Sequence, residues 1–67
     1  MAKIQLNGKK ITIKSKETIY DLLKRLKLNN KKIAIEHNGI IIPEVNYKKK
    51  YLKGKDKLEV VHFIGGG

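Results

Sequence analysis

Apolar and polar residues alternate in the two short segments that flank Asn7-Gly8. Such alternation is typical of β-strands with one buried face, and an Asn-Gly pair between them favours a two-residue hairpin turn. A turn of this length fixes the register, which pairs Leu6 with Lys9, Ile4 with Ile11 and Ala2 with Ile13. The face that we expect to be buried carries Ile4, Leu6, Ile11 and Ile13.

The period of the pattern changes after Glu17 and predicts a helix. Apolar residues recur at i, i+3, i+4 and i+7, as on one side of an amphipathic helix: Ile19, Leu22, Leu23 and Leu26. Thr18 can cap the first turn, and Asp21 can complete a capping box near the positive end of the helix dipole. We expect the helix to end at Asn29-Asn30 and to lie across a sheet.

The second half of the chain predicts another hairpin and a final strand. Asn38-Gly39 repeats the turn signal and sets Ile35 opposite Ile42, while Pro43 indicates an edge strand. The stretch 44–57 is rich in lysine and has no regular period, so we expect a loop with one helical turn. Its expected apolar anchors are Val45, Tyr47, Tyr51 and Leu52. The final strand is predicted over residues 58–64.

This order of elements predicts an α+β fold: a mixed sheet of four or five strands with one helix packed across it. We expect the last strand to be central, with Leu58 and Val60 turned toward the helix. Val61 and Phe63 then point toward solvent with Glu59, and an exposed apolar patch of this kind usually marks an interface. The alternative is that the loop 44–52 folds over this patch.

The length of 67 residues is enough for a single small domain, which we place at residues 1–64. The chain has no cysteine, and its two histidines, His37 and His62, are far apart in the sequence. This composition argues against a disulfide, a metal site or a catalytic cluster, and we expect both histidines to be structural or on the surface. No stretch is apolar enough to cross a membrane, so we expect a cytoplasmic protein, monomeric when free.

The formal net charge of +10 raises the possibility of nucleic-acid binding. Arg25 is the only arginine among the 16 basic residues, whereas recognition of base edges and phosphates favours arginine. The lysines are also spread along the whole sequence. We therefore keep a small basic nucleic-acid-binding domain as the alternative from a different class, and otherwise expect only non-specific binding at low salt.

The sequence ends in three glycines, Gly65, Gly66 and Gly67, directly after a run typical of a buried strand. Glycine has no Cβ, so this predicted flexible tail, 65–67, can pass through a channel too narrow for other residues. Three extended residues reach about 10 Å beyond the fold. The same ending would also be found at a frayed chain end or as a remnant of cloning.

Three segments of the sequence resemble the ubiquitin-like β-grasp family, and within it the sulfur carrier proteins of thiamin thiazole biosynthesis: Ile4 to Gly8, Ile19 to Leu23, and Glu59 to Gly67. The resemblance implies that the chain is not an enzyme and binds no cofactor itself. It implies instead that an ATP-dependent enzyme related to ubiquitin-activating enzymes adenylates the Gly67 carboxylate. Sulfur from cysteine, supplied by a cysteine desulfurase, would then give a thiocarboxylate.

The resemblance also implies that thiazole synthase takes the sulfur from this carrier. We predict that Val61, Phe63 and Ile64 dock on the partners, while Gly65 and Gly66 thread into the active sites. Three related alternatives share the fold: a carrier for molybdopterin synthesis, a carrier for transfer RNA thiolation, and a modifier conjugated to lysines. Whether the reacting carboxyl belongs to Gly67 or, after processing, to Gly66 is left open.

Overall fold

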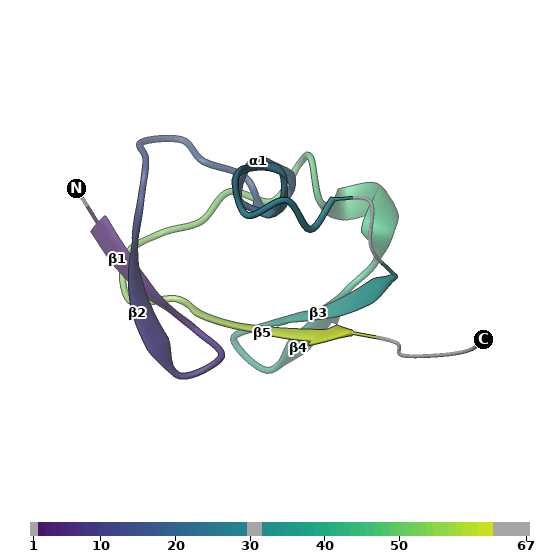
Figure 1. The fold of residues 1–67 in the computed structure, drawn as a ribbon. Coiled ribbons are helices and arrows are strands. Elements are labelled where there is room, and N and C mark those ends of the chain that lie inside the picture. The colour runs from purple at the N-terminus through teal and green to yellow at the C-terminus, as the bar shows by residue number, and fades with distance from the viewer. Residues whose placement is uncertain (1, 30–31, 63–67) are drawn as a thin grey trace.

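The computed structural model describes residues 2–29 and 32–62, which form a five-stranded mixed sheet with one α-helix across one face (Figure 1). The strand order is β2-β1-β5-β3-β4. The α+β fold predicted from the sequence is confirmed. The elements are β1 (Ala2–Leu6), β2 (Lys9–Ile13), α1 (Ile19–Arg25), β3 (Ile33–His37), β4 (Ile40–Ile42), a 3₁₀ turn η1 (Glu44–Asn46) and β5 (Lys57–His62).

Both predicted hairpins form in the predicted register. Ile4 pairs with Ile11 in the first hairpin, and Ile35 pairs with Ile42 in the second. The turn asparagines, Asn7 and Asn38, have φ of 50° and 52°, and the glycines after them also have positive φ. Positive φ at both turn residues suits the right-handed twist of the strands, which explains why Asn-Gly predicts these turns.

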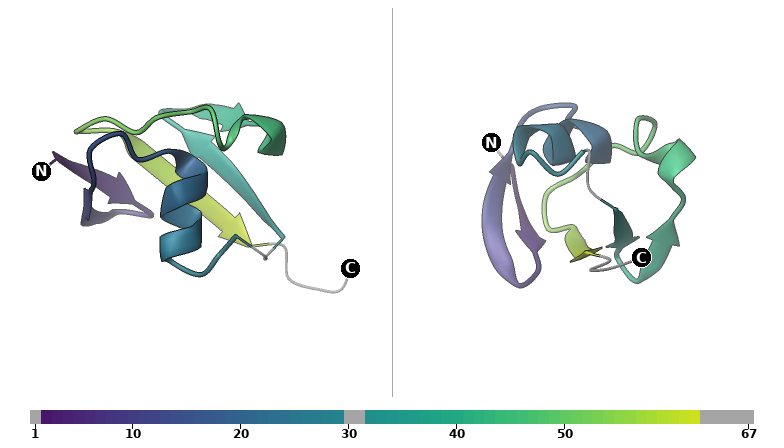
Figure 2. Two further views of the ribbon diagram at one scale, coloured as in Figure 1. Left: turned by 90° about the horizontal axis from the view of Figure 1, so that it is seen from above. Right: turned by 45° about the vertical axis from the view of Figure 1, so that its right-hand side comes forward.

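β5 is the central strand, as expected, and it lies beneath α1. It pairs in parallel with β1 over only two residue pairs, Gln5 with Lys57 and Leu6 with Leu58. On its other side it pairs antiparallel with β3 from Leu58 to His62. Figure 2 (left) shows β5 continuing past the end of β1. The last part of β5 therefore has a strand neighbour on the β3 side alone.

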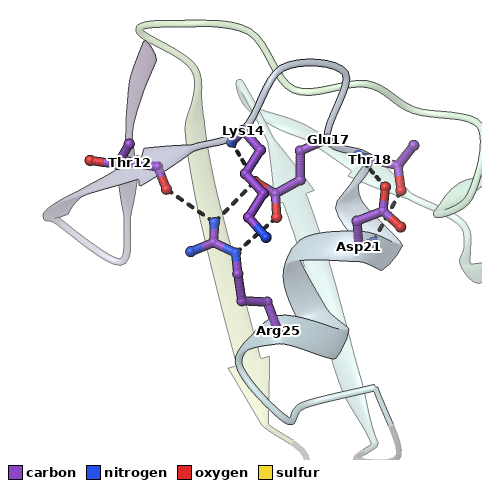
Figure 3. Close-up of polar contacts among 6 residues, drawn as sticks. All are labelled: Thr12, Lys14, Glu17, Thr18, Asp21 and Arg25. Atoms are coloured by element: carbon purple, nitrogen blue, oxygen red, sulfur yellow. Dashed lines mark hydrogen bonds and ion pairs between the residues drawn. The ribbon is translucent and has the colours of Figure 1, made fainter. Parts of the chain in front are cut away.

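The start of α1 matches the predicted capping box. The backbone N–H of Asp21 donates to Thr18 Oγ1 at 3.0 Å, and the N–H of Thr18 donates to Asp21 Oδ2 at 3.1 Å (Figure 3). Two backbone donors that the first helical turn leaves without helical partners are thereby satisfied. The leucine side of the helix packs on the sheet, with Leu22 and Leu23 almost fully buried.

The predicted end of the helix at Asn29-Asn30 is wrong. The helix ends at Arg25, and Lys27 adopts a left-handed φ of 61°. The N–H of Leu28 then donates to the carbonyl of Leu23 at 2.7 Å, which closes a Schellman motif. Because lysine seldom adopts positive φ, nothing in the local sequence marked this earlier stop.

The side chain of Arg25 ties the helix to the hairpin of β1 and β2. Its Nε lies 2.9 Å from Glu17 Oε2, and its Nη2 donates to Glu17 Oε1 and to the carbonyl of Thr12, each at 3.0 Å (Figure 3). Burial raises the pKa of Glu17, but the hydrogen bonds from Arg25 and from the N–H of Lys14 outweigh it and hold the pKa below the ordinary value. The ionised carboxylate is therefore the form that the fold favours.

The loop after β4 supplies only two of its four predicted anchors. Tyr47 and Leu52 are buried against the core, whereas Val45 is 78% and Tyr51 56% exposed, so the prediction for these two is wrong. The segment contains η1 and irregular turns, and such backbone has no fixed period from which inward positions can be predicted. No helix in the described part of the chain is long and apolar enough to cross a membrane.

Candidate functional site

Residues 58–61 of β5 carry the side chains whose orientation the sequence predicts. Leu58 is buried and Val60 is half-buried, both on the helix side of the sheet. Glu59 and Val61 face outward, and Val61 is 56% exposed. The predicted alternation along β5 is confirmed for these four residues. Phe63, the next residue predicted to face outward, lies outside the described residues.

The loop 44–52 does not cover Val61. It crosses the opposite side of the sheet, where the carbonyl of Tyr47 accepts from the N–H of Tyr20 and that of Lys50 accepts from Ile19, both at 3.0 Å. These bonds hold the loop to the first turn of α1, and Figure 1 shows the loop on the same side of the sheet as the helix. The alternative in which this loop buries the outer patch is therefore wrong for Val61.

The exposed side of Val61 has an apolar neighbour that the sequence analysis missed. Ala34 of β3 pairs directly with Val61, and paired side chains lie on the same face of a sheet. Further along that face, Ile41 of the edge strand β4 is 64% exposed. The sequence did not predict which side of the sheet Ile41 faces, because it lies in a run of three isoleucines that has no apolar–polar alternation.

The other predicted site residues fall outside the described residues: Phe63, Ile64, Gly65, Gly66 and Gly67. The predicted domain boundary after residue 64 falls there as well. Val61 is therefore the one member of the predicted docking patch whose position the structure gives. It lies one residue after Val60, whose backbone is held in an unusual way.

Asn7 contacts β5 with its side chain as well as with its backbone. Its N–H donates to the carbonyl of Leu58 at 2.9 Å, its Oδ1 accepts from the N–H of Val60 at 2.7 Å, and its Nδ2 donates to the carbonyl of Val60 at 3.3 Å. The sequence predicts Asn7 only as a turn residue. Nothing in the sequence indicates this long-range contact, since the positive φ that a hairpin turn requires is already enough to explain an Asn-Gly pair.

A second asparagine holds the other end of β5. Asn38 Oδ1 accepts from the N–H of Lys57 at 2.7 Å, and Asn38 Nδ2 donates to Asp56 Oδ1 at 3.1 Å. Asp56 is buried and also receives hydrogen bonds from the N–H of Lys53 and from His37 Nε2, both at 2.8 Å. His37 thus has a structural role, as expected. Asp56 lies among lysines, and no pattern in the sequence singles it out.

Asp56 titrates lower than an ordinary aspartate. Burial raises its pKa, but hydrogen bonds from His37, from the N–H of Lys53 and from Asn38 together outweigh burial and lower the pKa. The carboxylate therefore stays ionised beneath the turn that leads into β5. The contacts of Asp56 and Asn38 hold the turn 53–56 and Lys57, the first residue of β5.

The outer face of β1 is basic. A shallow groove of about 260 Å³ lies there, lined by Lys3, Ile4, Gln5, Lys10, Lys55 and Lys57. Among residues 2–29 and 32–62, no lysine is within ion-pair distance of a carboxylate. Within the same ranges, no group of three histidine, aspartate or glutamate side chains could hold a metal ion. The groove can attract anions, but its lining contains no carboxylate or histidine to form an acid–base pair with a lysine.

Comparison with known proteins gives the family. Residues 4–67 match the sequence profile of the ThiS family. The sulfur carrier protein ThiS of Bacillus subtilis is 43% identical over 65 residues, covering 96% of this chain and 98% of that protein. The crystal structure of the thiamine biosynthesis protein ThiS from Geobacter metallireducens superposes with a TM-score of 0.79 at 28% identity, covering 97% and 99% of the two chains.

A third relative differs in size. The thiazole synthase of Paramagnetospirillum magneticum is 37% identical over 65 residues, which are 97% of this chain but only 20% of that protein. A segment similar to this chain is therefore part of a much longer polypeptide in that organism. With the profile match over nearly its whole length and the match to the Bacillus carrier, the chain belongs to the ThiS family of sulfur carrier proteins.

Proposed function

We propose that this chain carries sulfur for thiazole formation in thiamin biosynthesis, as a thiocarboxylate on the carboxyl group of Gly67. The observation that carries the proposal is the match to the Bacillus sulfur carrier, which extends over nearly the whole of both proteins. The structural likeness to a second ThiS protein supports it, because the sheet and helix that present the C-terminal strand are the same. In this function the chain is a carrier and other proteins are the catalysts.

The proposed chemistry takes place on the main chain. A terminal carboxyl has a pKa near 3.5, so it is ionised at neutral pH and resists attack by nucleophiles. An oxygen of the carboxylate first attacks the α-phosphorus of ATP, pyrophosphate leaves, and an acyl adenylate forms. A cysteine-derived persulfide then displaces AMP from the acyl carbon, and a second thiol reduces the acyl disulfide to the thiocarboxylate. ATP is bound by the partner enzyme.

Three classes of partner follow from this scheme: an adenylating enzyme related to ubiquitin-activating enzymes, a cysteine desulfurase and thiazole synthase. The relative named thiazole synthase supports the last of these, since it contains a segment similar to this chain. The outward face of Val61, with Ala34 beside it, supports docking at the end of β5. We include Phe63 and Ile64 in this docking patch, with Gly65 and Gly66 as the segment that threads into the partner, and we place these reactions in the cytoplasm.

Intact-protein mass spectrometry tests the proposal. The chain is incubated with ATP, an adenylating enzyme of this class, cysteine and a cysteine desulfurase. We expect a mass increase that corresponds to one oxygen replaced by sulfur, and no increase in a variant that lacks Gly66 and Gly67. Absence of the increase with an enzyme that loads the Bacillus carrier would count against the proposal.

Two further measurements separate the related functions. Adding thiazole synthase and its substrates should return the chain to its original mass, whereas the synthases of molybdopterin or the enzymes of transfer RNA thiolation should leave the thiocarboxylate in place. Incubation with ATP and a cell extract should yield no isopeptide-linked products. A ladder of such products would instead support a protein modifier.

A further inference from the structure

We propose that Asn7 is a positioning residue for sulfur loading: its side-chain amide extends the ladder between β1 and β5 by one step and fixes the lateral position of β5 directly before Val61 of the docking patch. This inference rests on the proposed function. It adds that loading depends on Asn7, a residue outside the docking patch.

The parallel ladder between β1 and β5 is very short. After Leu6 pairs with Leu58, the N–H of Asn7 makes one more ladder bond, to the carbonyl of Leu58 at 2.9 Å. A strand that continued in register would next offer Val60 one carbonyl oxygen and one N–H. The backbone cannot do so, because it turns away at Asn7, where φ is 50°.

The side chain of Asn7 supplies both missing groups. Its Oδ1 accepts from the N–H of Val60 at 2.7 Å, and its Nδ2 donates to the carbonyl of Val60 at 3.3 Å. A primary amide contains the same acceptor and donor as a peptide unit, so it can take the place of the absent strand residue. The residues involved are 53 positions apart in the sequence, so this contact closes the fold over a long range.

The contact between Asn7 and Val60 matters for docking because of where Val60 lies in β5. Val60 is the residue before Val61, and here β5 has already run past the end of β1 (Figure 2). β3 still pairs with this part of the strand, so the strand itself does not depend on Asn7. Its lateral position does, because pairing on one side leaves the strand free to bend away from β1. A partner would then have to restrict that motion on binding, which costs affinity.

Asn38 provides a matched comparison within the same molecule. It is also the first residue of an Asn-Gly turn, its φ is 52°, and its Oδ1 accepts from a backbone N–H of β5, that of Lys57, at 2.7 Å. Asn38 therefore makes the same kind of contact at the start of β5, whereas Asn7 makes it near the end that carries Val61. Loss of either contact weakens the fold, and only loss of the Asn7 contact should impair docking.

The experiment compares Asn7→Gly with Asn38→Gly in the full chain. Glycine keeps the positive φ of each turn and deletes only the side-chain contacts. Amide hydrogen exchange at Val60 reports the anchor, and KM and kcat for thiocarboxylate formation with the adenylating enzyme, ATP and the sulfur donor report docking. For Asn7→Gly we expect faster exchange at Val60 and a KM raised roughly tenfold, with kcat unchanged, since two hydrogen bonds of ordinary strength are lost.

The control variant and a conservative one complete the test. Asn38→Gly should lower the melting temperature at least as much as Asn7→Gly does and leave KM at the wild-type value. Asn7→Asp keeps the acceptor for the N–H of Val60 and loses the donor, so its KM should lie between those of wild type and Asn7→Gly.

Two results would overturn the inference: a wild-type KM in Asn7→Gly despite faster exchange at Val60, or an equal rise of KM in both glycine variants. The first would show that the anchor does not matter for docking, and the second that loss of stability alone explains the effect. If the wild-type chain is not loaded at all, the proposed function fails instead. The exchange rates of Val60 would still decide whether Asn7 anchors β5.

Discussion

His37 Nε2 lies 2.8 Å from Asp56 Oδ2, and this contact joins the end of β3 to the turn that precedes β5. Asp56 also accepts hydrogen bonds from Asn38 Nδ2 and from the N–H of Lys53. Asp56→Ala leaves the buried His37 and two part-buried donors without an acceptor, so we expect it to lower the free energy of unfolding by about 3 kcal/mol. Urea denaturation at neutral pH measures this change.

The matched control is Glu44→Ala, because Glu44 is an exposed acidic residue at the start of η1. Its unfolding free energy should stay within about 0.5 kcal/mol of wild type. Equal effects of the two substitutions would contradict a structural role for the buried carboxylate.

Glu17 and Asp56 together predict a loss of stability in acid. The fold holds the pKa of Glu17 below its ordinary 4.5 and the pKa of Asp56 below its ordinary 3.8. A carboxyl group whose pKa is lower in the folded than in the unfolded chain stabilises the fold above its ordinary pKa, and this contribution disappears as the pH falls through the folded value. The contribution of these two groups to the urea midpoint should therefore be constant from pH 7 to about pH 5 and should fall below it.

Glu17→Gln separates the two carboxyl groups. This variant is less stable than wild type at pH 7, and its midpoint should fall less steeply between pH 5 and pH 3, since one of the two groups no longer titrates. Parallel curves for the variant and wild type would show that Glu17 does not contribute to the acid response.

Glu36 and Glu59 lie directly opposite each other on β3 and β5 and face outward. Like charges at opposing positions of a sheet are destabilising, whereas opposite charges stabilise by about 0.2–1 kcal/mol. Glu59→Lys should therefore raise the melting temperature, and Glu59→Gln should raise it less. A lower melting temperature for Glu59→Lys at low salt would refute this explanation.

A substitution in the core should affect stability, whereas deletion of the glycine tail should affect sulfur loading. Leu22 is fully buried, so Leu22→Ala should lower the free energy of unfolding by about 2–5 kcal/mol. A chain that lacks Gly65 to Gly67 should keep the wild-type melting temperature and lose sulfur loading completely. A tail deletion that destabilises the fold would show that the glycines belong to the folded domain.

Val61 allows a test of the docking patch. Val61→Asp places a charge on the outer face and should raise KM for loading by more than about tenfold, as for a central interface residue. Val45→Asp is the matched control, because Val45 is even more exposed but belongs to η1. Its KM should equal that of wild type. If both variants load like wild type, the docking surface lies elsewhere.

Much of the fold could be predicted because its strongest signals are local. Asn7-Gly8 and Asn38-Gly39 fix two turns and, with them, the register of four strands. Thr18 and Asp21 mark the start of the helix, because both partners of the capping box lie within one turn of chain. Alternation along β5 then gave the outward position of Val61.

The remaining features depend on contacts between distant residues. Asp56 lies in a polar, irregular stretch, and only its position beneath His37 makes it a structural residue. The side chain of Asn7 reaches Val60 because β1 and β5 are neighbours in parallel, which local pattern does not reveal. Lys27 adopts a conformation that its side chain does not favour, so the helix stops where no residue type announces it.

The strand order has a consequence for how the protein is made. β5 separates β1 from β3 in the sheet, so the two hairpins synthesised earlier on the ribosome have no shared edge until β5 has emerged. A nascent chain interrupted before Lys57 would lack the strand that joins them and would remain open to proteases. Only molecules translated through β5 can therefore complete the five-stranded sheet.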